Sequence, residues 1–440
     1  MIRAIARYGV RSSPGDEKEI IAAFRRGEAI EGPAIAEFET HFAYSLEMNH
    51  AATASFGRMA FYYILRSLNL APGSEILFPA LTFWVVPEIA RRAGFKPVFV
   101  DVDSTTFNLN PAAIEAAITD QTRVIVPTHL YGRPCEMAKI MRLAEKYSLV
   151  VVEDCAQAAG AVYRGRKVGT FGHASFFSFQ LLKGINTYGG GMMVTNDAQI
   201  AENVRSQASQ EPPQSLPDLI RRLTLGLIAR SLVSPRAFTY WGWPIGAAMS
   251  ITGDYDLSKY IWERIRPLNS FPRAYRQRYS NVQAILGLRA LQKLDEFNAR
   301  CRAHANVYTN GLADCRAIQT PKNVPGIEDV FYQYCIYSSA PTQAKRRAIR
   351  RGVDFEVTHV DVCSALDLFK DFAADCPGAE KTTEALQLPV YSRLRSADVE
   401  RILHVVREVM SDFSPIEAET MRPPSSPEFL LSDAPRPRPG

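Results

Sequence analysis

The sequence contains no C-x-x-C pair, and its seven cysteines are scattered along the chain. An odd number of cysteines argues against a complete disulfide framework, so we interpret them as reduced thiols that mostly fill the core. No stretch of about 18 residues is free of charge, which excludes a membrane-spanning helix. The first ten residues lack the apolar segment of an export signal, and we therefore expect a cytoplasmic protein.

The chain also lacks a long block of basic residues. Its 51 lysines and arginines nearly balance 46 aspartates and glutamates, which leaves a formal net charge of +5 over 440 residues. Binding along a nucleic-acid backbone requires a denser basic surface, so we expect no nucleic-acid partner. With 47% hydrophobic residues, the composition is that of a globular protein with a large core and a smaller one.

Short β-branched or aromatic runs alternate with helical segments between residues 50 and 200, which is typical of parallel strands joined by crossover helices. Several runs are apolar without alternation, as strands covered on both faces require. The expected strands are 75–78, 97–101, 123–127, 149–153, 175–178 and 192–195. Polar or small residues follow several of them, and ligands of open α/β sheets bind beyond such strand ends.

A helical pattern that begins at Tyr279 and continues through Arg300 indicates a second domain. Beyond it, a strand at 332–337 and a final helix with an apolar stripe over 399–410 predict a smaller α+β domain. We therefore expect an N-terminal segment (1–30), a large cofactor-binding α/β domain (31–275) and a small C-terminal domain (276–413). The proline-rich residues 414–440 should form a disordered tail.

Residues 150–197 combine a carboxylate, a lysine and a glycine cluster. Asp154 follows a buried strand, and Lys183 lies between Ser178 and three consecutive glycines at 189–191. Pyridoxal phosphate needs a lysine to hold its aldehyde as a Schiff base, a carboxylate to keep its pyridine nitrogen protonated, and hydroxyl or amide donors for its phosphate. The pattern therefore suits pyridoxal phosphate, and we expect no metal site.

Motifs along most of the chain resemble those of the DegT-type (StrS-like) sugar aminotransferases, pyridoxal phosphate enzymes with the aspartate aminotransferase fold. The resemblance spans roughly residues 28–412. It rests on motifs in matching order: PALTF at 79–83, FVDVD at 99–103, HLYG at 129–132, VEDCAQ at 152–157, SFQLLK at 178–183, VTND at 194–197, QAILGL at 283–288 and LPVY at 388–391. It implies a fold of type I, an α/β chain whose mostly parallel sheet of about seven strands holds the cofactor at its carboxyl edge, with a smaller C-terminal α+β domain.

Carried over by position, the resemblance implies that Lys183 is the Schiff-base lysine and Asp154 the partner of the pyridine nitrogen. Gln157 would lie near the ring, Ser178 would bind the phosphate, and Phe83 would stack on the ring. Taken alone, each residue also fits an ordinary structural role, such as a surface cation, a strand-end cap or a core aromatic. The order and spacing of the motifs favour the cofactor roles.

The chain departs from the family where the phosphate would bind. Phe56-Gly57-Arg58 replaces Ser-Gly-Thr, so Gly57 can still offer its amide, while Arg58 could bind phosphate bidentately or pair with an acidic neighbour. The family also takes an asparagine and an arginine from the neighbouring subunit. Arg278 fits the arginine, which implies a homodimer, and Arg276 replaces the asparagine.

Further positions leave the substrate open. Leu182 replaces a threonine before the lysine, and Tyr188-Gly189 replaces a Gly-Glu pair. The role of His129 in the HLYG motif also stays open, because a lone histidine at a strand end is often structural. Sugar dehydratases of the same family carry histidine at the lysine position, so Lys183 favours transamination.

Residues 205–265 form an apolar insertion, since the segment from Asp197 to Gln283 is about twice as long as in the family. Ser215 and Asp218 resemble a capping box. The helix that follows should carry residues 216, 219, 220, 223 and 227 on one face, followed by aromatic residues among arginines, a composition typical of an interfacial helix. Two interpretations stay open: packing on the protein's own dimer or active site, and peripheral contact with the inner membrane surface through 216–250.

The expected function is transfer of an amino group, from a donor such as glutamate, to a keto-sugar that is most simply nucleotide-linked. A lipid-linked or cyclitol ketone is an alternative acceptor, which the apolar insertion would suit. A non-catalytic regulator that binds pyridoxal phosphate is another alternative, because the phosphate site is altered.

Overall fold

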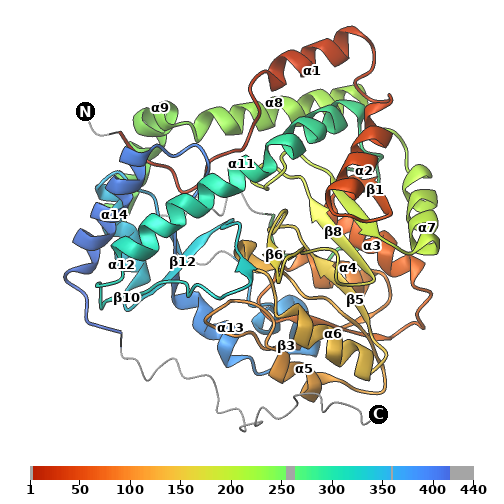
Figure 1. Ribbon diagram of the computed structural model, residues 1–440. Helices are drawn as coiled ribbons and strands as arrows, with labels where there is room; N and C mark the ends of the chain where they lie inside the picture. The colour runs from red at the N-terminus through yellow and green to blue at the C-terminus, as the bar shows by residue number, and fades with distance from the viewer. Residues whose placement is uncertain (1–2, 254–262, 358–359, 417–440) are drawn as a thin grey trace, which may run out of the picture.

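A seven-stranded sheet lies at the centre of the computed structural model, which describes residues 3–253, 263–357 and 360–416 (Figure 1). Its strand order is β1-β9-β8-β5-β4-β2-β3. The strands are β1 (His50–Ala54), β2 (Glu75–Pro79), β3 (Lys96–Val100), β4 (Thr122–Ile125), β5 (Val150–Asp154), β8 (Ala174–Ser178) and β9 (Gly191–Thr195). Strands β3, β2, β4, β5 and β8 are parallel, whereas β9 and β1 are antiparallel to their neighbours. The expected α/β chain with a mostly parallel central sheet of about seven strands is confirmed.

All six strands predicted between residues 75 and 195 are present within two residues of their expected bounds. Strand β1 was not predicted, because its sequence, His-Ala-Ala-Thr-Ala, has little of the β-branched and aromatic character of ordinary strands. It pairs along its full length with β9 and is buried at four of its five positions. Pairing and burial therefore override its weak local propensity.

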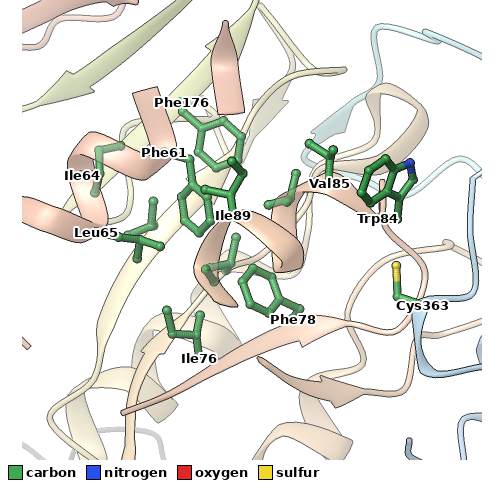
Figure 2. Close-up of a cluster of buried hydrophobic side chains, with 14 of the residues drawn as sticks. Phe61, Ile64, Leu65, Ile76, Phe78, Trp84, Val85, Ile89, Phe176 and Cys363 are labelled. Atoms are coloured by element: carbon green, nitrogen blue, oxygen red, sulfur yellow. The ribbon is translucent and has the colours of Figure 1, made fainter. Parts of the chain in front are cut away.

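Helices cover both faces of the sheet. In β2, Ile76 and Phe78 point into a core shared with α3 (Gly57–Ser67) and α4 (Val85–Arg92), where Phe61 and Ile89 meet them (Figure 2). Leu77 points to the opposite face, into a core shared with α5 (Pro111–Ala117) and α6 (Met137–Lys146). This burial on both faces explains why the parallel strands read as continuous apolar runs.

A second, four-stranded sheet has the order β10-β12-β14-β13. Its strands are β10 (Ile318–Gln319), β12 (Tyr334–Ser338), β13 (Glu356–Val357) and β14 (Ala385–Leu388), packed with α12 (Pro341–Arg350) and α14 (Ser396–Met410). The predicted strand at 332–337 thus begins two residues later than expected. A three-stranded sheet joins β6 (Val162–Tyr163), β7 (Arg166–Lys167) and β11 (Ile327–Glu328).

The long helix α11 (Asn281–Gly311) packs against both parts of the chain. Its first half contributes Ala284 and Leu294 to a cluster with α2 (Ala34–Ser45), and its second half contributes Cys301 and Tyr308 to the core of the small sheet. The domain boundary expected at 275/276 stays a prediction, since this helix crosses from one part to the other.

The described part of the insertion up to residue 252 folds mostly into helices. After α7 (Ala198–Ser209), it forms α8 (Leu216–Leu232), α9 (Pro235–Ala237), the π-helical turn η2 (Phe238–Gly242) and α10 (Trp243–Thr252). The Asp218 amide donates to Ser215 Oγ, as a cap at the start of α8 requires. Of the residues predicted to share one face of α8, Leu219 and Leu223 are buried against α1 (Asp16–Arg25) and α11, whereas Leu216 and Ile220 are exposed.

All seven cysteines are free, and all except Cys315 are buried, which confirms that they are thiols that mostly fill the core. In the part of the chain that the structure describes, no helix is both long enough and apolar enough to cross a membrane. The predicted tail lies almost entirely outside the described residues.

Candidate active site

Asp154 is the last residue of β5, at the carboxyl edge of the parallel strands. Its side chain is buried, and its Oδ1 accepts a hydrogen bond from the amide of Ala156 at 2.9 Å. Burial raises the pKa of Asp154 from 3.8 to about 6, and the Ala156 amide and the charge of Lys183 partly oppose this rise. A buried carboxylate with this single hydrogen bond from the described residues retains acceptor capacity for a cation.

Lys183 lies in the turn that follows β8. Its Nζ is 4.8 Å from the centroid of the Tyr332 ring, a cation–π distance. The residue as a whole is partly exposed, but burial of the amine lowers the pKa of Lys183 to about 8, an effect that Asp154 opposes and Arg58 increases. The amine is therefore more readily neutral than that of an ordinary lysine, as a nucleophile requires.

Tyr332 was not predicted as a site residue. It precedes β12, and its backbone amide lies so close to Gly132 that a Cβ there would be 2.7 Å from the Tyr332 nitrogen. Gly132 also has a φ of +90°, which favours glycine. The absence of a side chain at Gly132, in the HLYG motif, thus lets the loop that carries Tyr332 pack against it. This contact joins segments far apart in the sequence, so no local pattern predicts it.

The expected phosphate end of the site lies where α3 begins. Gly57 is the first residue of α3, and a Cβ at this position would lie 2.8 Å from the Phe177 carbonyl oxygen and 3.1 Å from the Ser178 Cβ. Glycine therefore lets the N-terminus of α3 approach the end of β8 directly. A helix N-terminus beside a serine hydroxyl offers amide and hydroxyl donors to an anion.

Arg58 lies in an aromatic enclosure. Its guanidinium carbon is 5.4 Å from the ring centroids of Phe56 and Phe83 and 5.0 Å from that of Tyr275. The same guanidinium pairs with the carboxylate of Glu263 and hydrogen-bonds to the hydroxyl of Tyr275. Of the two roles considered for Arg58, the structure displays the pairing with an acidic neighbour, and its contact with phosphate stays a prediction.

Glu263 and Tyr275 were also not predicted as site residues. Tyr275 Oη donates to Glu263 Oε1 at 2.7 Å, and the indole nitrogen of Trp84 donates to the Glu263 carbonyl oxygen at 3.4 Å. Burial alone would raise the pKa of Glu263, but Arg58 and Tyr275 hold it below its usual value. The C-terminal end of the insertion thus supplies the anionic partner of Arg58.

The remaining predicted residues are distributed around this centre. Phe83 is partly buried and its ring contacts Arg58, whereas the adjacent Trp84 is a core residue, and the stacking of Phe83 on a cofactor ring stays a prediction. Gln157 Oε1 accepts a hydrogen bond from the Tyr131 amide at 2.9 Å. Arg278 contacts Glu31, with 2.7 Å between Nη2 and Oε1, instead of Asp154 or Lys183 of its own chain.

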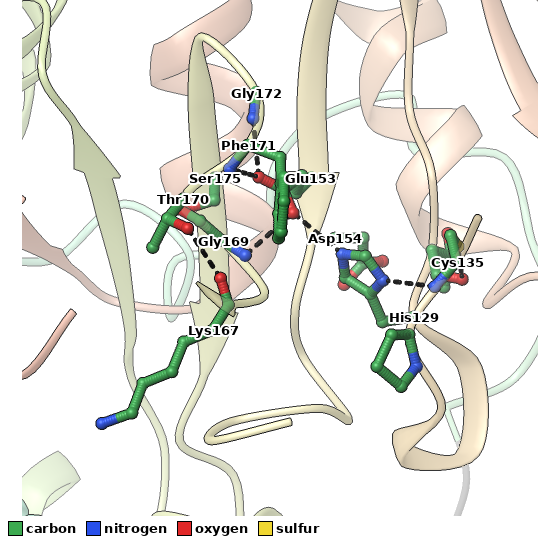
Figure 3. A network of polar contacts seen from close by, with 12 residues as sticks. His129, Cys135, Glu153, Asp154, Lys167, Gly169, Thr170, Phe171, Gly172 and Ser175 are labelled. Carbon is green, nitrogen blue, oxygen red and sulfur yellow. Dashed lines mark hydrogen bonds and ion pairs between the residues drawn. The ribbon is translucent and has the colours of Figure 1, made fainter. Parts of the chain in front are cut away.

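His129 belongs to a buried polar network behind Asp154 (Figure 3). Its Nδ1 accepts a hydrogen bond from the Cys135 amide at 3.0 Å, so its Nε2 carries the proton that it donates to Glu153, also at 3.0 Å. The Glu153 carboxylate also accepts hydrogen bonds from the amides of residues 169, 171 and 172. His129 and Glu153 therefore fix the end of β5, and both are fully buried.

His129, Glu153 and Cys155 bring possible metal-ligand atoms within 4.8 Å of one another. Both carboxylate oxygens of Glu153 and both ring nitrogens of His129 already make hydrogen bonds inside the protein. These hydrogen bonds explain why the His129 and Glu153 side chains lie close together.

These residues could hold pyridoxal phosphate. Asp154 offers a buried carboxylate with unused acceptor capacity, Lys183 offers an amine with a lowered pKa, and Gly57 and Ser178 lie together at a helix N-terminus. A pyridinium nitrogen, an aldehyde and a phosphate are the three groups that such a set would accept.

Comparison with known proteins gives a consistent result. The model of the DegT/DnrJ/EryC1/StrS aminotransferase family matches residues 13–407. The chain is 30% identical over 400 residues to a pleiotropic regulatory protein of Geobacillus stearothermophilus, covering 89% of this chain and 93% of that protein. It is 29% identical over 386 residues to the GDP-perosamine synthase of Caulobacter vibrioides, covering 86% of this chain and 91% of the relative.

Among solved structures, the chain resembles DesV of S. venezuelae, which was crystallised in complex with a ketimine intermediate. The TM-score is 0.71 and the sequence identity 27%, with 91% of this chain and 95% of DesV covered. The fold and the sequence therefore point to the same group of proteins.

Proposed function

Because the chain belongs to the DegT/DnrJ/EryC1/StrS aminotransferase family, we propose that it transfers an amino group from a donor such as glutamate to the keto group of a nucleotide-linked sugar. We further propose that pyridoxal phosphate is the cofactor. The name of its relative GDP-perosamine synthase, which includes a nucleotide-linked sugar, supports this class of acceptor. Lysine at position 183, in place of the dehydratase histidine, supports transfer over dehydration.

The pair of Asp154 and Lys183 carries the proposal. When bound, pyridoxal phosphate supplies an electron sink that stabilises negative charge at the substrate carbon. The Asp154 carboxylate would hold the proton on the pyridine nitrogen, because a buried anion stabilises a neighbouring cation. The Lys183 amine would hold the cofactor and then move a proton at the substrate carbon, for which a pKa of about 8 is well matched to neutral pH.

A panel of nucleotide-linked keto-sugars tests this function. Purified protein with pyridoxal phosphate should lose its long-wavelength absorbance with glutamate and regain it with a suitable keto-sugar. Lys183→Ala should abolish both changes, whereas Lys139→Ala, at an exposed lysine on α6, should leave them intact. Absence of cycling with every nucleotide-linked ketone would contradict the proposed acceptor class.

The exposed apolar residues of the insertion favour a second candidate acceptor, a lipid-linked ketone, and a cyclitol ketone belongs in the same panel. The name of the Geobacillus stearothermophilus relative keeps a regulatory role among the hypotheses. The absorbance assay separates these possibilities, because a regulator would bind the cofactor without cycling it.

We also propose that the protein acts as a homodimer in the cytoplasm, with Arg278 reaching the site of the neighbouring subunit. In its own chain Arg278 lies against Glu31 and Pro212, away from Lys183. Mixing the inactive variants Arg278→Ala and Lys183→Ala should then restore part of the activity, because a hybrid dimer contains one complete site. No recovery in verified hybrids would contradict shared sites.

A further inference from the structure

The insertion carries most of the large apolar side chains that the described residues expose. Fifteen such side chains are exposed, and ten of them lie between residues 216 and 251. Soluble proteins normally expose such side chains singly, and a concentration of them marks a contact surface. We call these ten residues the apolar surface: Leu216, Ile220, Leu225, Ile228, Leu232, Tyr240, Trp241, Ile245, Met249 and Ile251.

The fold of the insertion presents this surface outward. Helix α8 packs Leu219, Leu223 and Leu227 against α1 and α11, whereas its five other leucine and isoleucine side chains are exposed. Helix α10 contains no charged residue and is anchored to α12, where Arg350 donates to the Ser250 carbonyl oxygen at 2.6 Å. Trp241 is 71% exposed and Ile251 74%, so packing within the described chain leaves them largely uncovered.

An arginine-lined cleft adjoins the apolar surface. Its volume is about 620 Å³, and it lies between the N-terminal segment, the α8–η2 segment and the loop after β14. We call it the arginine cleft, and its lining includes no carboxylate. Its charged residues are Arg3, Arg230, Arg236, Arg393 and Arg395, and Tyr240 belongs to both the cleft and the apolar surface.

Part of this positive charge is not held in ion pairs with described residues. Arg3 and Arg395 pair with Asp398, and Arg230 pairs with Glu17. Arg236 and Arg393 form no ion pair with a described residue, and both are exposed. The rim of the cleft therefore offers two guanidinium groups, which bind phosphate oxygens bidentately.

We propose that the apolar surface and the arginine cleft together dock the protein on an anionic lipid bilayer. Tyr240, Trp241 and the aliphatic residues enter the headgroup–acyl boundary, while Arg236 and Arg393 bind lipid phosphates. The charged residues between 216 and 252 are four arginines and one aspartate, which is complementary to anionic lipid. Helix α10 is only ten residues long and α8 is interrupted by arginines, so both lie along the membrane and do not cross it.

The same charges argue against a second copy as the occupant. A symmetric interface brings the same patch of both subunits together, so an excess of arginines over acidic residues would face the same excess. The docking also does not depend on the acceptor, because vesicle binding requires neither cofactor nor substrate. Failure of the proposed amino transfer would therefore leave this proposal standing, and the reverse also holds.

Flotation of the full-length protein with vesicles tests the proposal. The protein should float with phosphatidylcholine vesicles that contain phosphatidylglycerol at low salt, float much less with pure phosphatidylcholine, and dissociate at high salt. Replacing Arg236 and Arg393 by glutamine should weaken partitioning about thirtyfold, since each basic residue near an anionic surface contributes a factor of about five. The triple variant Tyr240→Ser, Trp241→Ser, Ile245→Ser should not float.

Matched controls keep the test specific. Tyr44→Ser and Arg300→Gln change an exposed tyrosine on α2 and an exposed arginine on α11, and both should float as the unaltered protein does. Brominated lipids should quench the fluorescence of Trp241 in bound protein. No flotation at low salt, flotation that is equal on neutral vesicles, or unchanged flotation of the triple variant would overturn the proposal. A triple variant that instead changes oligomeric state, without any vesicle binding by the parent protein, would assign the surface to a second copy.

Discussion

Replacing Asp154 by asparagine should stabilise the cofactor-free protein even though it removes most of the amino transfer. Burial raises the pKa of Asp154 from 3.8 to about 6, a difference of about two pH units. Each unit corresponds to 1.36 kcal/mol, so the ionised carboxylate costs the folded state about 3 kcal/mol above pH 6. Asparagine has the same shape, can accept the hydrogen bond from Ala156 and carries no charge to desolvate.

The stability difference between Asp154→Asn and the unaltered protein should depend on pH, in a direction set by the pKa of Asp154. Because the pKa of Asp154 is higher in the folded state, folded protein binds the proton more tightly than unfolded protein between about pH 4 and pH 6. The stability of the unaltered protein therefore falls across this window, and the variant lacks that fall. The advantage of Asp154→Asn should grow from near zero at pH 4 to about 3 kcal/mol at pH 7 and then stay constant.

Urea unfolding of protein freed of pyridoxal phosphate measures this difference, with absorbance used to verify that the cofactor is gone. The neighbouring Glu153→Gln is the matched contrast, because Glu153 is buried but accepts hydrogen bonds from His129 and three backbone amides. That variant should lose about 3 kcal/mol or more, since an amide cannot accept at its nitrogen. A destabilised Asp154→Asn at pH 7, or a gain that is equal at pH 4 and pH 7, would refute the argument from burial.

Three further outcomes are expected. Borohydride reduction of the loaded enzyme should place the pyridoxyl group on Lys183, and peptide mapping that finds it elsewhere would remove this residue from its proposed role. Arg58→Ala should weaken pyridoxal phosphate binding about tenfold, since the contact of a charged group with phosphate contributes about 1.4 kcal/mol or more. Glu263→Gln should not weaken this binding, because the substitution frees Arg58 for the phosphate. Fluorescence titration measures both, and unchanged affinity in Arg58→Ala would assign this arginine to the aromatic enclosure alone. Gly132→Ala should lower the free energy of unfolding in urea by about 1–3 kcal/mol, because alanine is strained at a φ of +90° and its Cβ would meet the backbone of Tyr332. An unchanged unfolding midpoint would show that the loop carrying Tyr332 can move away.

The sequence was most informative where local pattern and chemistry coincide. Strands buried on both faces produce continuous apolar runs, so β2 to β5, β8 and β9 could be recognised from composition alone. Asp154 and Lys183 could be singled out as candidates because Asp154 ends one such strand and Lys183 follows the next strand of the sheet. Their proximity follows from the parallel order of β5 and β8.

Contacts between distant segments could not be predicted in this way. Tyr332 reaches Lys183 through a loop that packs on Gly132, and Glu263 reaches Arg58 from the C-terminal end of the insertion. Tyr332 and Glu263 lie in no recognisable motif. Tertiary packing brings them to the site, and local sequence does not reveal it. The protonation of His129 also became readable only when both of its hydrogen-bond partners were known.

The continuity of α11 has a mechanical consequence. A helix of 31 residues is about 46 Å long, and bending it sharply would break several backbone hydrogen bonds. Since one half of this rod is embedded in each of two cores, the two parts of the chain turn together and not as independent jaws. The insertion adds a second brace, because α8 rests on α1 while Trp243 donates to the Ile349 carbonyl oxygen at 2.7 Å. Any change in access to Lys183 would therefore come from loops and not from closure of the two parts of the chain.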